Sequence, residues 1–426
     1  MRVAWAAGKP QGARVESEGS LCALQSQAFF LSFVEVRTRY CAPASVVREF
    51  ADMKTPNANR KAPLFAAILA GGRGERFWPV GRRSRPKQFV DLFGGKPLIA
   101  HATDRLRGLV PTSRILVVTS ADLVPATRAA LPSLAPDQVL GEPEGRDTAA
   151  ACALATAWVR AKAGESAVVA ILTADHLMAD AVGFRETLAS AASVAAARPV
   201  MALVGIKPTH PATGYGYVEL GAPFSGPGLP KGFRKVRRFV EKPNLGTAAV
   251  YVKSGRFVWN SGMFVWRVSV FEDALRRFRP ALSEAMGRLA PLFASPRAVR
   301  AALKREYSAL EKISVDYAVM EKADNLVAVR GDFGWDDVGA WTSAGEHFPK
   351  DASGNAVHGA AQLLAATGNV VANTQRGHLV AVMGASDLVV VHTPDATLVC
   401  TREAAPGLKA LVAQIGADPA TAHFVE

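Results

Sequence analysis

Three glycines follow the first apolar segment of the chain at a spacing that suits phosphate binding. Gly71, Gly72 and Gly74 come directly after the apolar run 64–69, and Arg76 stands two residues further on. Glycine lets the backbone turn sharply and approach a ligand, and successive free N–H groups can bind phosphate oxygens. An arginine can add charge-assisted hydrogen bonds to the same oxygens. The segment therefore favours a phosphate-binding loop, although an ordinary tight turn has the same composition.

The spacing of the loop excludes two other phosphate motifs. The pattern GxxxxGK followed by Ser or Thr is missing from it, and Phe77 stands where a dinucleotide-binding GxGxxG needs its third glycine. The following segment 82–88 adds four cationic residues, Lys87 among them, and a bend fixed by Pro86. A cationic phosphate site and a solvated basic loop both remain open at this point.

Two aspartates stand where a divalent cation could bind. Asp175 lies just past the apolar run 167–172, and Asp337 lies in a Trp- and Gly-rich segment. Magnesium prefers oxygen ligands, and ligands of open α/β sheets bind outside the carboxyl ends of strands. The alternative is that each aspartate caps a helix or belongs to a turn. Asp336 is an adjacent acidic candidate, and His176 could be a ligand, a base or a structural hydrogen-bonding group.

Alternating strands and helices must position these side chains. Short apolar, β-branched runs occur at 64–69, 114–119, 167–172 and 200–206, and helical stretches include 148–162 and 184–197. This alternation predicts an α/β fold with a Rossmann-like, mostly parallel sheet that helices cover on both faces. Ser269 and Glu272 have the spacing of a capping box that opens a helix ending near Phe278.

The residues after Trp341 have a different sequence pattern. From Gly354 onward, short Val-rich runs are separated by Gly, Asn, Asp and Pro turns, which predicts a small β-rich module. The runs are 370–372, 379–382, 388–391 and 397–399. The residues from Ala405 onward are typical of a helix. We therefore expect a domain carrying the candidate site over 61–345 and a C-terminal β-rich domain over 346–426.

Residues 1–60 differ from the rest of the chain. Their apolar patch at 28–36 is interrupted by Glu35 and has no clean cleavage site after it, so we do not interpret it as a secretory signal. Met53 precedes a polar stretch, so the segment is interpreted as an extension, disordered or upstream of a true start at Met53. Intact-mass analysis of the native protein tests this hypothesis, and a species carrying residues 1–52 would refute it.

Composition and charge restrict the class of protein. The 426 residues are 49% hydrophobic and 20% charged, and none of their apolar runs reaches the roughly 18 residues of a transmembrane helix, so no membrane partner is expected. Four scattered cysteines without a CxxC pair fit a reducing compartment, and we expect the cytoplasm. The formal charge of +13 suits either nucleic acid or a polyphosphate substrate. No basic stripe with interleaved aromatics is present, so we expect no nucleic-acid partner.

The glycine loop and its basic continuation resemble a known signature. The segments 71–79 and 86–89 together resemble that of sugar-1-phosphate nucleotidyltransferases, in the form found in mannose-1-phosphate guanylyltransferases. Glu75 stands where Thr or Ser is commoner, and Gly81 where Ser is common, but neither departure removes a charged phosphate contact. The resemblance covers about 64–341 densely, and the β-rich tail is similar to the family's C-terminal left-handed β-helix module.

The resemblance implies roles for particular residues. The implied catalytic residues are Arg76, Lys87, Asp175 and Asp337, and the two aspartates are the implied metal ligands. The implied nucleotide-binding residues are Leu69, Ala70, Gly71, Gly72, Gly74, Arg76, Glu142, Arg146, Asp147 and Asp175. The implied sugar-phosphate-binding residues are Lys87, Gly214, Tyr215, Glu241, Lys242 and Asn260.

Recognition of guanine is implied for the segment 141–150. A carboxylate or backbone acceptor can bind the N1–H and N2–H₂ edge that separates guanine from adenine. Asp147 replaces the usual Asn, so which side chain binds the base stays open. The plain alternative is that Asp147 or Thr148 caps the next helix.

The implied activity is transfer of GMP from GTP to mannose 1-phosphate, with Mg²⁺ as cofactor, giving GDP-mannose and pyrophosphate. A sugar phosphate has a second pKa of about 6 and is already a dianionic nucleophile at neutral pH, so no covalent enzyme intermediate is expected. Three alternatives stay open: a related enzyme using glucose 1-phosphate or another nucleoside triphosphate, a nucleotide-sugar-binding regulator without catalysis, and a nucleic-acid-binding protein. A homodimer is a further open expectation.

Overall fold

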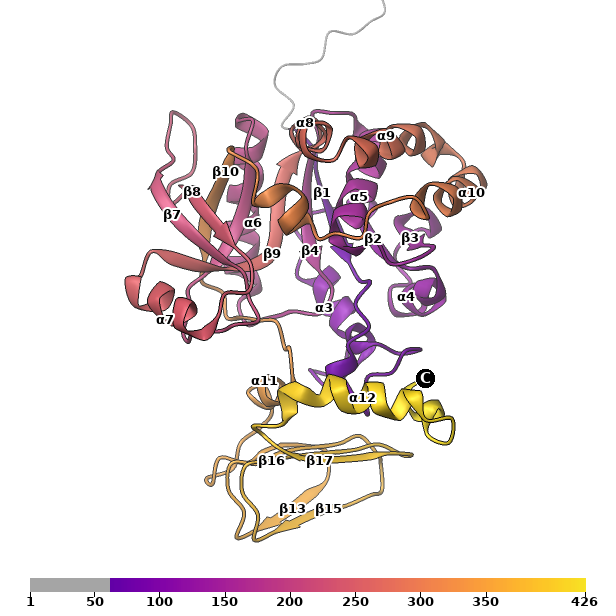
Figure 1. Cartoon of the computed structure of the whole chain (residues 1–426), viewed down its shortest axis with the longest axis vertical. Coiled ribbons are helices and arrows are strands. Elements are labelled where there is room, and N and C mark those ends of the chain that lie inside the picture. Colours follow the sequence, from indigo (N-terminus) through magenta and orange to yellow (C-terminus); the bar gives the residue numbers. More distant parts are fainter. Residues whose placement is uncertain (1–61) are drawn as a thin grey trace, which may run out of the picture. The chain divides into compact units, whose positions relative to one another are not determined.

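A nine-stranded mixed sheet organises the first part of the described chain (Figure 1). The structure is a computed structural model that describes residues 62–426, so the expected extension and the proposed start at Met53 lie outside the described residues. The strand order is β3-β2-β1-β4-β9-β6-β10-β8-β7. The strands are β1 Leu64–Leu69, β2 Ile115–Ser120, β3 Val139–Glu142, β4 Val168–Thr173, β6 Met201–Ile206, β7 Tyr217–Pro223, β8 Arg234–Val240, β9 Phe257–Arg267 and β10 Leu326–Gly331.

Most strands of this sheet share one direction. β3, β2, β1 and β4 pair in parallel, and β6 pairs in parallel with β10. β9 and β8 run antiparallel to their neighbours. The expectation of a mostly parallel α/β sheet is therefore confirmed, with β8 and β9 as the antiparallel members that the apolar runs did not predict.

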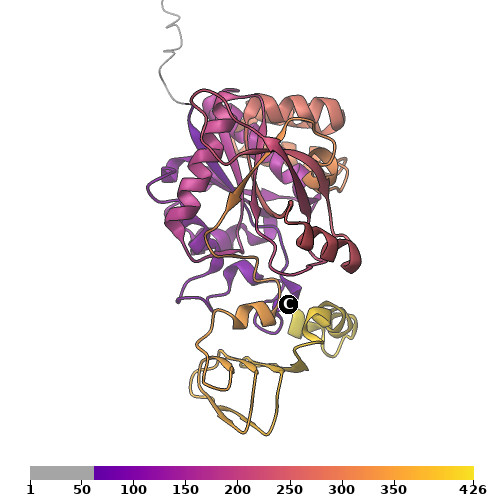
Figure 2. The ribbon, with the colours of Figure 1, turned by 90° about the vertical axis from the view of Figure 1, so that its left-hand side faces the viewer.

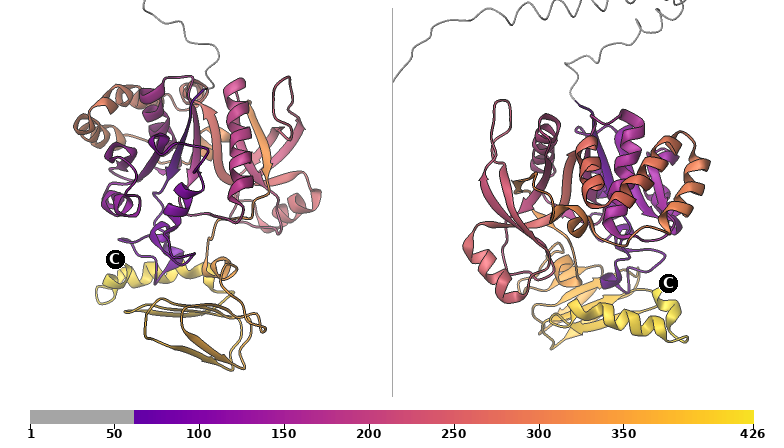
Figure 3. Two further views of the ribbon diagram at one scale, coloured as in Figure 1. Left: turned by 180° about the vertical axis from the view of Figure 1, so that it is seen from behind. Right: turned by 45° about the horizontal axis from the view of Figure 1, so that its top comes forward.

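Helices cover both faces of the sheet because its strands are apolar on both faces (Figures 1 and 3). In β1, Phe65 and Ala67 join one core cluster, while Ala66 and Ile68 join the other, as successive strand residues must. The first cluster contains residues of α5 Asp147–Ala163, α8 Val268–Phe278, α9 Pro280–Leu289 and α10 Pro296–Tyr307. The second is covered by α3 Leu98–Asp104, α4 Val124–Ala130, α6 Ala181–Ala197 and α7 Leu245–Ser254. None of the helices within 62–426 has the length and apolar character that a bilayer crossing needs.

The predicted capping box at Ser269 and Glu272 is wrong. α8 begins at Val268, with Arg267 at the N-cap and without a side-chain cap, so Ser269 lies inside the helix. Glu272 instead pairs with Arg160 of α5 at 2.5 Å. β9 leads directly into α8 and Val268 is fully buried, so tertiary packing fixes the start of the helix. Its end at Phe278 is as expected.

The C-terminal strands form stacked coils, which confirms a β-helix-like module (Figure 2). β12 Ala356–His358, β14 Val370–Asn373 and β16 Leu388–His392 pair in parallel, as do β13 Ala361–Leu364 and β15 Val380–Met383. β17 Thr397–Thr401 closes the stack antiparallel to β16. A buried ladder aligns the coils, because Asn369 Nδ2 donates to Asn355 Oδ1 at 2.9 Å and the Leu388 N–H donates to Asn369 Oδ1 at 2.9 Å.

A third hydrophobic core joins this module to the glycine loop. It contains Phe77 and Trp78 from the loop, Val370 and Val389 from the coils, and Leu408 from the last long helix. Helix α11 Trp341–Gly345 and helix α12 Leu408–Ala417 also contribute to it. The coils therefore support the segment on which phosphate binding was predicted.

Candidate active site

Parallel pairing of β1 with β4 brings the glycine loop beside Asp175. Leu69 and Thr173 are partners in register at the carboxyl ends of these strands, and the Ala174 N–H donates to the Leu69 carbonyl at 3.1 Å. The loop then leaves β1 and Asp175 leaves β4 at the same edge of the sheet. This is the edge at which ligands of open α/β sheets bind.

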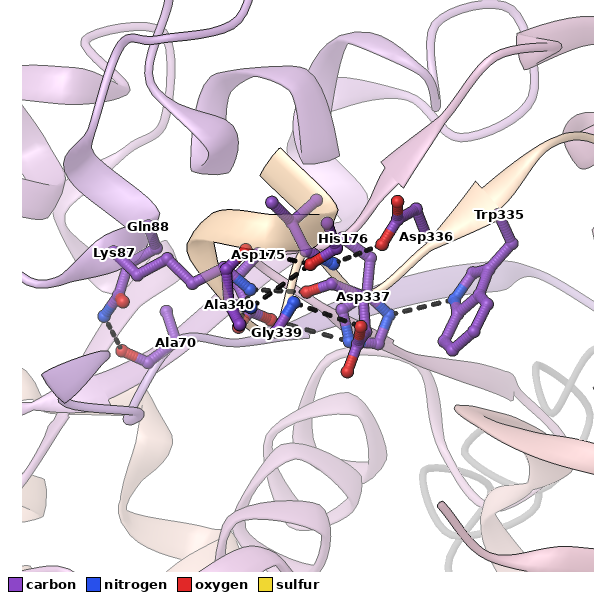
Figure 4. A network of polar contacts seen from close by, with 12 residues as sticks. Ala70, Lys87, Gln88, Asp175, His176, Trp335, Asp336, Asp337, Gly339 and Ala340 are labelled. Carbon is purple, nitrogen blue, oxygen red and sulfur yellow. Dashed lines mark hydrogen bonds and ion pairs between the residues drawn. The ribbon is translucent and has the colours of Figure 1, made fainter. Parts of the chain in front are cut away.

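Lys87 crosses this edge to the first aspartate (Figure 4). It stands at the start of a short helix, Lys87–Phe89, and is only 5% exposed. Its Nζ donates to Asp175 Oδ2 at 3.0 Å and to the Asp337 backbone carbonyl at 2.5 Å. One cation therefore holds together three segments that lie far apart in the sequence.

Gly74 packs directly beneath Lys87. Its φ is +59°, and a Cβ at this position would lie 2.4 Å from Lys87 Cβ and 2.7 Å from the Lys87 nitrogen. Both the left-handed backbone and the close approach therefore require glycine here. The position of Lys87 therefore depends on the absence of a side chain at Gly74.

The variant Gly74→Ala is expected to lower kcat/KM by about tenfold or more, because a displaced lysine loses its aligned contacts. The left-handed backbone adds a stability cost of about 1–2 kcal/mol. Steady-state kinetics and thermal melts measure both effects. Gly108→Ala is the matched control, since Gly108 also has positive φ (+85°) but has nothing within 4 Å of its added Cβ. It should lose stability and keep KM; unchanged kinetics in Gly74→Ala would contradict the role given to Gly74.

A two-stranded ladder places Asp337 opposite Asp175. β5 Leu177–Met178 follows Asp175 and pairs antiparallel with β11 Trp335–Asp336, which precedes Asp337. Asp337 Oδ1 accepts from the Tyr215 hydroxyl at 2.8 Å and from the Gly339 N–H at 3.1 Å. These two donors fix one carboxylate oxygen of Asp337.

The adjacent Asp336 is engaged elsewhere. Its Oδ1 accepts from the Val338 N–H at 2.7 Å, and its Oδ2 lies 2.8 Å from His347 Nε2. Hydrogen bonds lower the pKa of Asp336 although its burial would raise it. The two neighbouring carboxylates therefore have different surroundings, and Asp337 is the one on the cavity described next.

Both aspartates line one cavity of about 330 Å³, here called the loop cavity. Its lining is Gly74, Glu75, Arg76, Phe77, Lys87, Asp175, His176, Asp337, Gly339 and Lys409. Arg76 is exposed and forms no ion pair with a carboxylate within residues 62–426. The loop cavity thus combines three carboxylates, the two aspartates and Glu75, with several cations, as a site for a metal and phosphates requires.

The donor set fits a magnesium ion that takes further ligands from a substrate. Asp337 Oδ2 accepts no hydrogen bond from the described residues, whereas Oδ1 accepts two. Within the described part of the chain, no group of three or more His, Cys, Asp or Glu side chains could hold a metal by itself. Mg²⁺ commonly binds one or two carboxylates and completes its shell with substrate phosphates and water.

Local charges keep Asp175 ionised. Its burial would raise its pKa, but the charge of Lys87, together with hydrogen bonds, leaves the pKa of Asp175 below its usual value. The side chain lies deep in the protein yet is 38% exposed, because its open side faces the cavity. Burial lowers the pKa of His176, and the Trp335 indole N–H donates to its Nδ1 at 3.1 Å. His176 is therefore a neutral, oriented imidazole.

Arg105 is a residue that the sequence analysis missed. It is 8% exposed, and its Nη2 donates to the His176 carbonyl at 3.0 Å. Burial lowers the pKa of Arg105 to about 10, while Asp175 raises it, so the guanidinium stays charged. It supports the turn that carries both Asp175 and His176. A single arginine just past the end of a helix carries no motif, so the sequence offered no signal for it.

A second cavity of about 350 Å³, the strand-end cavity, adjoins the loop cavity at Asp175. Its volume lies at the lower end of small-molecule sites, which span roughly 300–1,000 Å³. Six predicted nucleotide-binding residues line it: Leu69, Gly71, Gly72, Glu142, Asp147 and Asp175. Its other walls include Val118, Ala151, Ile171 and Phe264. An apolar slot with a few polar groups suits a planar base.

Four other predicted nucleotide-binding residues lie outside the strand-end cavity. Gly74 and Arg76 line the loop cavity. The Ala70 carbonyl accepts from Gln88 Nε2 at 2.8 Å and anchors the loop. Arg146 pairs with Glu144 at 2.8 Å and donates to the Ser308 carbonyl at 2.7 Å, and it is not among the residues lining either cavity.

The alternative that Asp147 or Thr148 caps α5 is wrong. The helix has Arg146 at its N-cap and lacks a side-chain cap. Asp147 Oδ1 accepts only from the neighbouring Thr148 N–H, at 2.7 Å, while Thr148 Oγ1 accepts from the Val315 N–H at 2.9 Å. Asp147 thus remains a side chain on the cavity wall, in a left-handed backbone with φ of +64°.

Glu142 is the buried carboxyl group of the strand-end cavity. It is 7% exposed, and its Oε1 has no hydrogen-bond partner among the described residues. Burial raises the pKa of Glu142 to about 7, partly offset by the nearby Tyr307 hydroxyl, which lies outside hydrogen-bonding geometry. An unsatisfied buried acceptor of this kind is ready for donors on a ligand.

The raised pKa of Glu142 predicts that stability falls as pH rises. The folded carboxyl, with a pKa of about 7 against an ordinary 4.5, binds more protons than the unfolded one between these values. Its destabilisation is absent below that window and complete above it, on the order of 3 kcal/mol. Thermal melts of the ligand-free protein from acidic to basic pH measure the slope. Glu142→Gln should flatten it and raise the melting temperature at alkaline pH; an unchanged slope would contradict the raised pKa.

Three of the predicted sugar-phosphate residues, Glu241, Lys242 and Asn260, form a polar cluster around Asp316. Asn260 Nδ2 donates to Asp316 Oδ1 at 2.9 Å, and both side chains line the strand-end cavity. Lys242 pairs with Glu241 at 2.8 Å, and the buried Glu241 Oε2 has no partner within residues 62–426. Burial, together with Glu241, raises the pKa of Asp316 to about 6. Asp316 was missed because it lies outside the resembling motifs.

Two glycines flank Tyr215 and differ in their surroundings. A Cβ on Gly214 would meet nothing within 4 Å, so no close approach to the described residues requires glycine there. At Gly216 the space is closed, since an added Cβ would lie 2.3 Å from Glu241 Oε2 and 3.2 Å from Asn260 Cβ. The Gly216 carbonyl also accepts from the Asn260 N–H at 2.8 Å. Between them, Tyr215 reaches Asp337 with its hydroxyl.

Comparison with known proteins identifies the class that this geometry serves. Residues 65–354 match the family described as nucleotidyl transferase. Residues 353–415 match the MannoseP isomerase/GMP-like beta-helix domain. The chain therefore belongs to the nucleotidyl transferase family, and the prediction of a nucleotidyltransferase enzyme is confirmed.

The similar proteins carry more particular names. Mannose-1-phosphate guanylyltransferase of Escherichia coli is 36% identical over 371 residues, which is 86% of this chain and 76% of the relative. Xanthan biosynthesis protein XanB of Xanthomonas campestris is 36% identical over 360 residues, covering 84% and 74%. A crystal structure from Thermus thermophilus, named mannose-1-phosphate geranyltransferase, superposes with a TM-score of 0.73 at 36% identity, covering 83% of this chain and 99% of that one.

Proposed function

We propose that this chain transfers GMP from GTP to α-D-mannose 1-phosphate and releases GDP-mannose and pyrophosphate. The observation that carries the proposal is that Asp175 and Asp337 line one cavity with Lys87, and that this cavity adjoins the slot containing Glu142. The names of the similar proteins support mannose 1-phosphate as the acceptor. The scattered cysteines support a cytoplasmic site of action.

The reaction needs alignment and charge stabilisation more than an activated nucleophile. The sugar-phosphate oxygen attacks the α-phosphorus of GTP in line, the bond to the α–β bridging oxygen breaks, and its electron pair leaves with pyrophosphate. Two unit charges about 4 Å apart at an effective dielectric of about 20 repel by roughly 4 kcal/mol. We propose that Lys87 and Arg76 on the loop cavity, with Lys242 in the polar cluster, offset this repulsion.

Asp175 and Asp337 are the proposed magnesium ligands. Both carboxylates face the loop cavity, and the charge of Lys87 keeps Asp175 ionised. Bound there, Mg²⁺ would neutralise phosphate charge and restrict the orientation of the phosphate oxygens. The Tyr215 and Gly339 donors hold Asp337 Oδ1, which orients the other oxygen for this role.

Glu142 is the residue proposed to recognise the guanine base. Its unsatisfied, buried Oε1 can accept from the N1–H and N2–H₂ groups of guanine, and adenine offers no N1–H or N2–H₂ group. Ionised Glu142 accepts best, so binding of GTP near neutral pH should release a proton.

A substrate panel tests the proposal directly. Pyrophosphate release is measured for the common nucleoside triphosphates, each with mannose 1-phosphate and glucose 1-phosphate, with and without magnesium. The proposal requires the highest kcat/KM for GTP with mannose 1-phosphate and loss of turnover after chelation. A preference for glucose 1-phosphate or another nucleotide would indicate a related sugar-1-phosphate nucleotidyltransferase with a different substrate. Binding of the substrates without turnover would indicate a regulator.

A further inference from the structure

The loop cavity receives one cation from the C-terminal module. Lys409 lines it together with Lys87, Asp175 and Asp337, although it lies more than 320 positions after Lys87 in the sequence. It stands in the first turn of α12, directly after Leu408, which is 4% exposed in the third core. The burial of Leu408 therefore fixes the point from which the lysine reaches the cavity.

Further contacts hold α12 and the residues after it against the glycine loop. The Trp78 indole N–H donates to the Phe424 carbonyl at 2.9 Å. The Arg83 N–H donates to the Val425 carbonyl at 3.0 Å, and the Ser84 N–H donates to the Glu426 carbonyl at 2.9 Å. These contacts lie beyond the C-terminal end of the helix, whereas Leu408 is buried at its start, so α12 is anchored at both ends.

Lys87 and Lys409 differ in how strongly a neighbouring carboxylate already neutralises their charge. Lys87 is 5% exposed and bonded to Asp175, so its charge balances that carboxylate. Lys409 Nζ lies 3.6 Å from Glu75 Oε2, beyond hydrogen-bonding distance, and its side chain is 70% exposed. An exposed pair of this kind is weak, so Lys409 can exchange Glu75 for a stronger anion.

The course of the glycine loop indicates which anion that is. Gly71 and Gly72 line the strand-end cavity, while Gly74 and Arg76 line the loop cavity. A triphosphate that followed the loop would therefore run from the base slot into the loop cavity, with its far end beside Arg76. Lys409 lines this same cavity together with Arg76.

We propose that Lys409 is a further substrate-contacting residue, which binds the β- and γ-phosphates of the nucleotide and then the departing pyrophosphate. This inference rests on the proposed nucleotidyl transfer. It makes the C-terminal module part of the active site, because without α12 the loop cavity lacks one of its cations.

Kinetics in both directions test this proposal on the full-length protein. Lys409→Met should raise KM for GTP, and in the reverse reaction KM for pyrophosphate, by about tenfold, the loss of one charge-assisted contact. KM for mannose 1-phosphate should not change, and Lys409→Arg should restore most of the affinity. Lys304→Met is the matched control, since Lys304 is an exposed lysine of α10 that is not among the residues lining either cavity.

Glu75→Gln separates a phosphate contact from a merely structural pair. If Lys409 binds phosphate, loss of the competing Glu75 charge should lower KM for pyrophosphate, opposite to the effect of Lys409→Met. Equal increases in both variants, or an unchanged KM in Lys409→Met, would overturn the proposal. Calorimetric binding of pyrophosphate does not involve the sugar, so a weaker affinity in Lys409→Met supports the inference even where the substrate panel rejects mannose 1-phosphate.

Discussion

Replacement of Lys87 by alanine is expected to lower kcat by about a hundredfold or more, with the fold retained. Lys87 Nζ contacts both Asp175 and the Asp337 carbonyl, so its loss removes a cation from the reacting centre and disconnects the two aspartate segments. A hundredfold loss corresponds to about 2.7 kcal/mol of transition-state stabilisation, which is ordinary for one charged contact to a developing anion. Saturating steady-state kinetics and circular dichroism measure the two quantities.

Lys96 provides the matched control for this substitution. Its Nζ pairs with Asp104 Oδ2 at 2.6 Å, but its side chain is 51% exposed and it is not among the residues lining either cavity. Lys96→Ala therefore removes a similar ion pair without touching the site, and kcat should stay at the wild-type value. Near-normal turnover in Lys87→Ala would contradict the catalytic role proposed for Lys87.

Asp337→Asn is expected to reduce turnover by about a hundredfold and to raise the magnesium concentration needed for half-maximal rate. The amide oxygen can still accept from Tyr215 and Gly339, so the local structure should persist while the charge is lost. Asp175→Asn should act in the same direction, and it also removes the charged partner of Lys87. Rates measured across a magnesium titration separate metal affinity from kcat.

Asp336→Asn is the control that isolates the effect of position. It removes the same charge one residue earlier, where the carboxylate bonds to the Val338 N–H and His347. This variant should lose some stability and keep the wild-type magnesium dependence. If Asp336→Asn and Asp337→Asn shift the magnesium response equally, a general loss of negative charge explains the result and the ligand assignment is wrong.

The part of the site built from strand ends could be predicted from the sequence. β1 and β4 are short apolar runs, and parallel neighbours end at the same edge, so the glycine loop and Asp175 had to lie together. The sequence could not separate Asp336 from Asp337. That choice depends on the pairing of β11 with β5 and on the left-handed backbone at Val338, with φ of +46°, which turns the chain after the second aspartate.

Residues that act through tertiary contacts carried no local signal. Lys409 reaches the loop cavity only because the coils of the C-terminal module pack against Phe77 and Trp78. Arg105 supports Asp175 from a neighbouring turn, through the His176 carbonyl. The capping box failed for the related reason that burial of Val268 set the start of α8. The spacing of a motif predicts the chemistry that a segment can perform. The packing of distant segments determines which side chains lie next to it.

An anomalous diffraction map of crystals grown with GTP and Mn²⁺ tests the central claim most directly. Manganese shares the oxygen ligands of magnesium and is visible by its anomalous signal. The account predicts a metal peak in the loop cavity that contacts carboxylate oxygens of both Asp175 and Asp337 and an oxygen of the nucleotide phosphates. A metal held by the phosphates alone, or bound away from either aspartate, would contradict it.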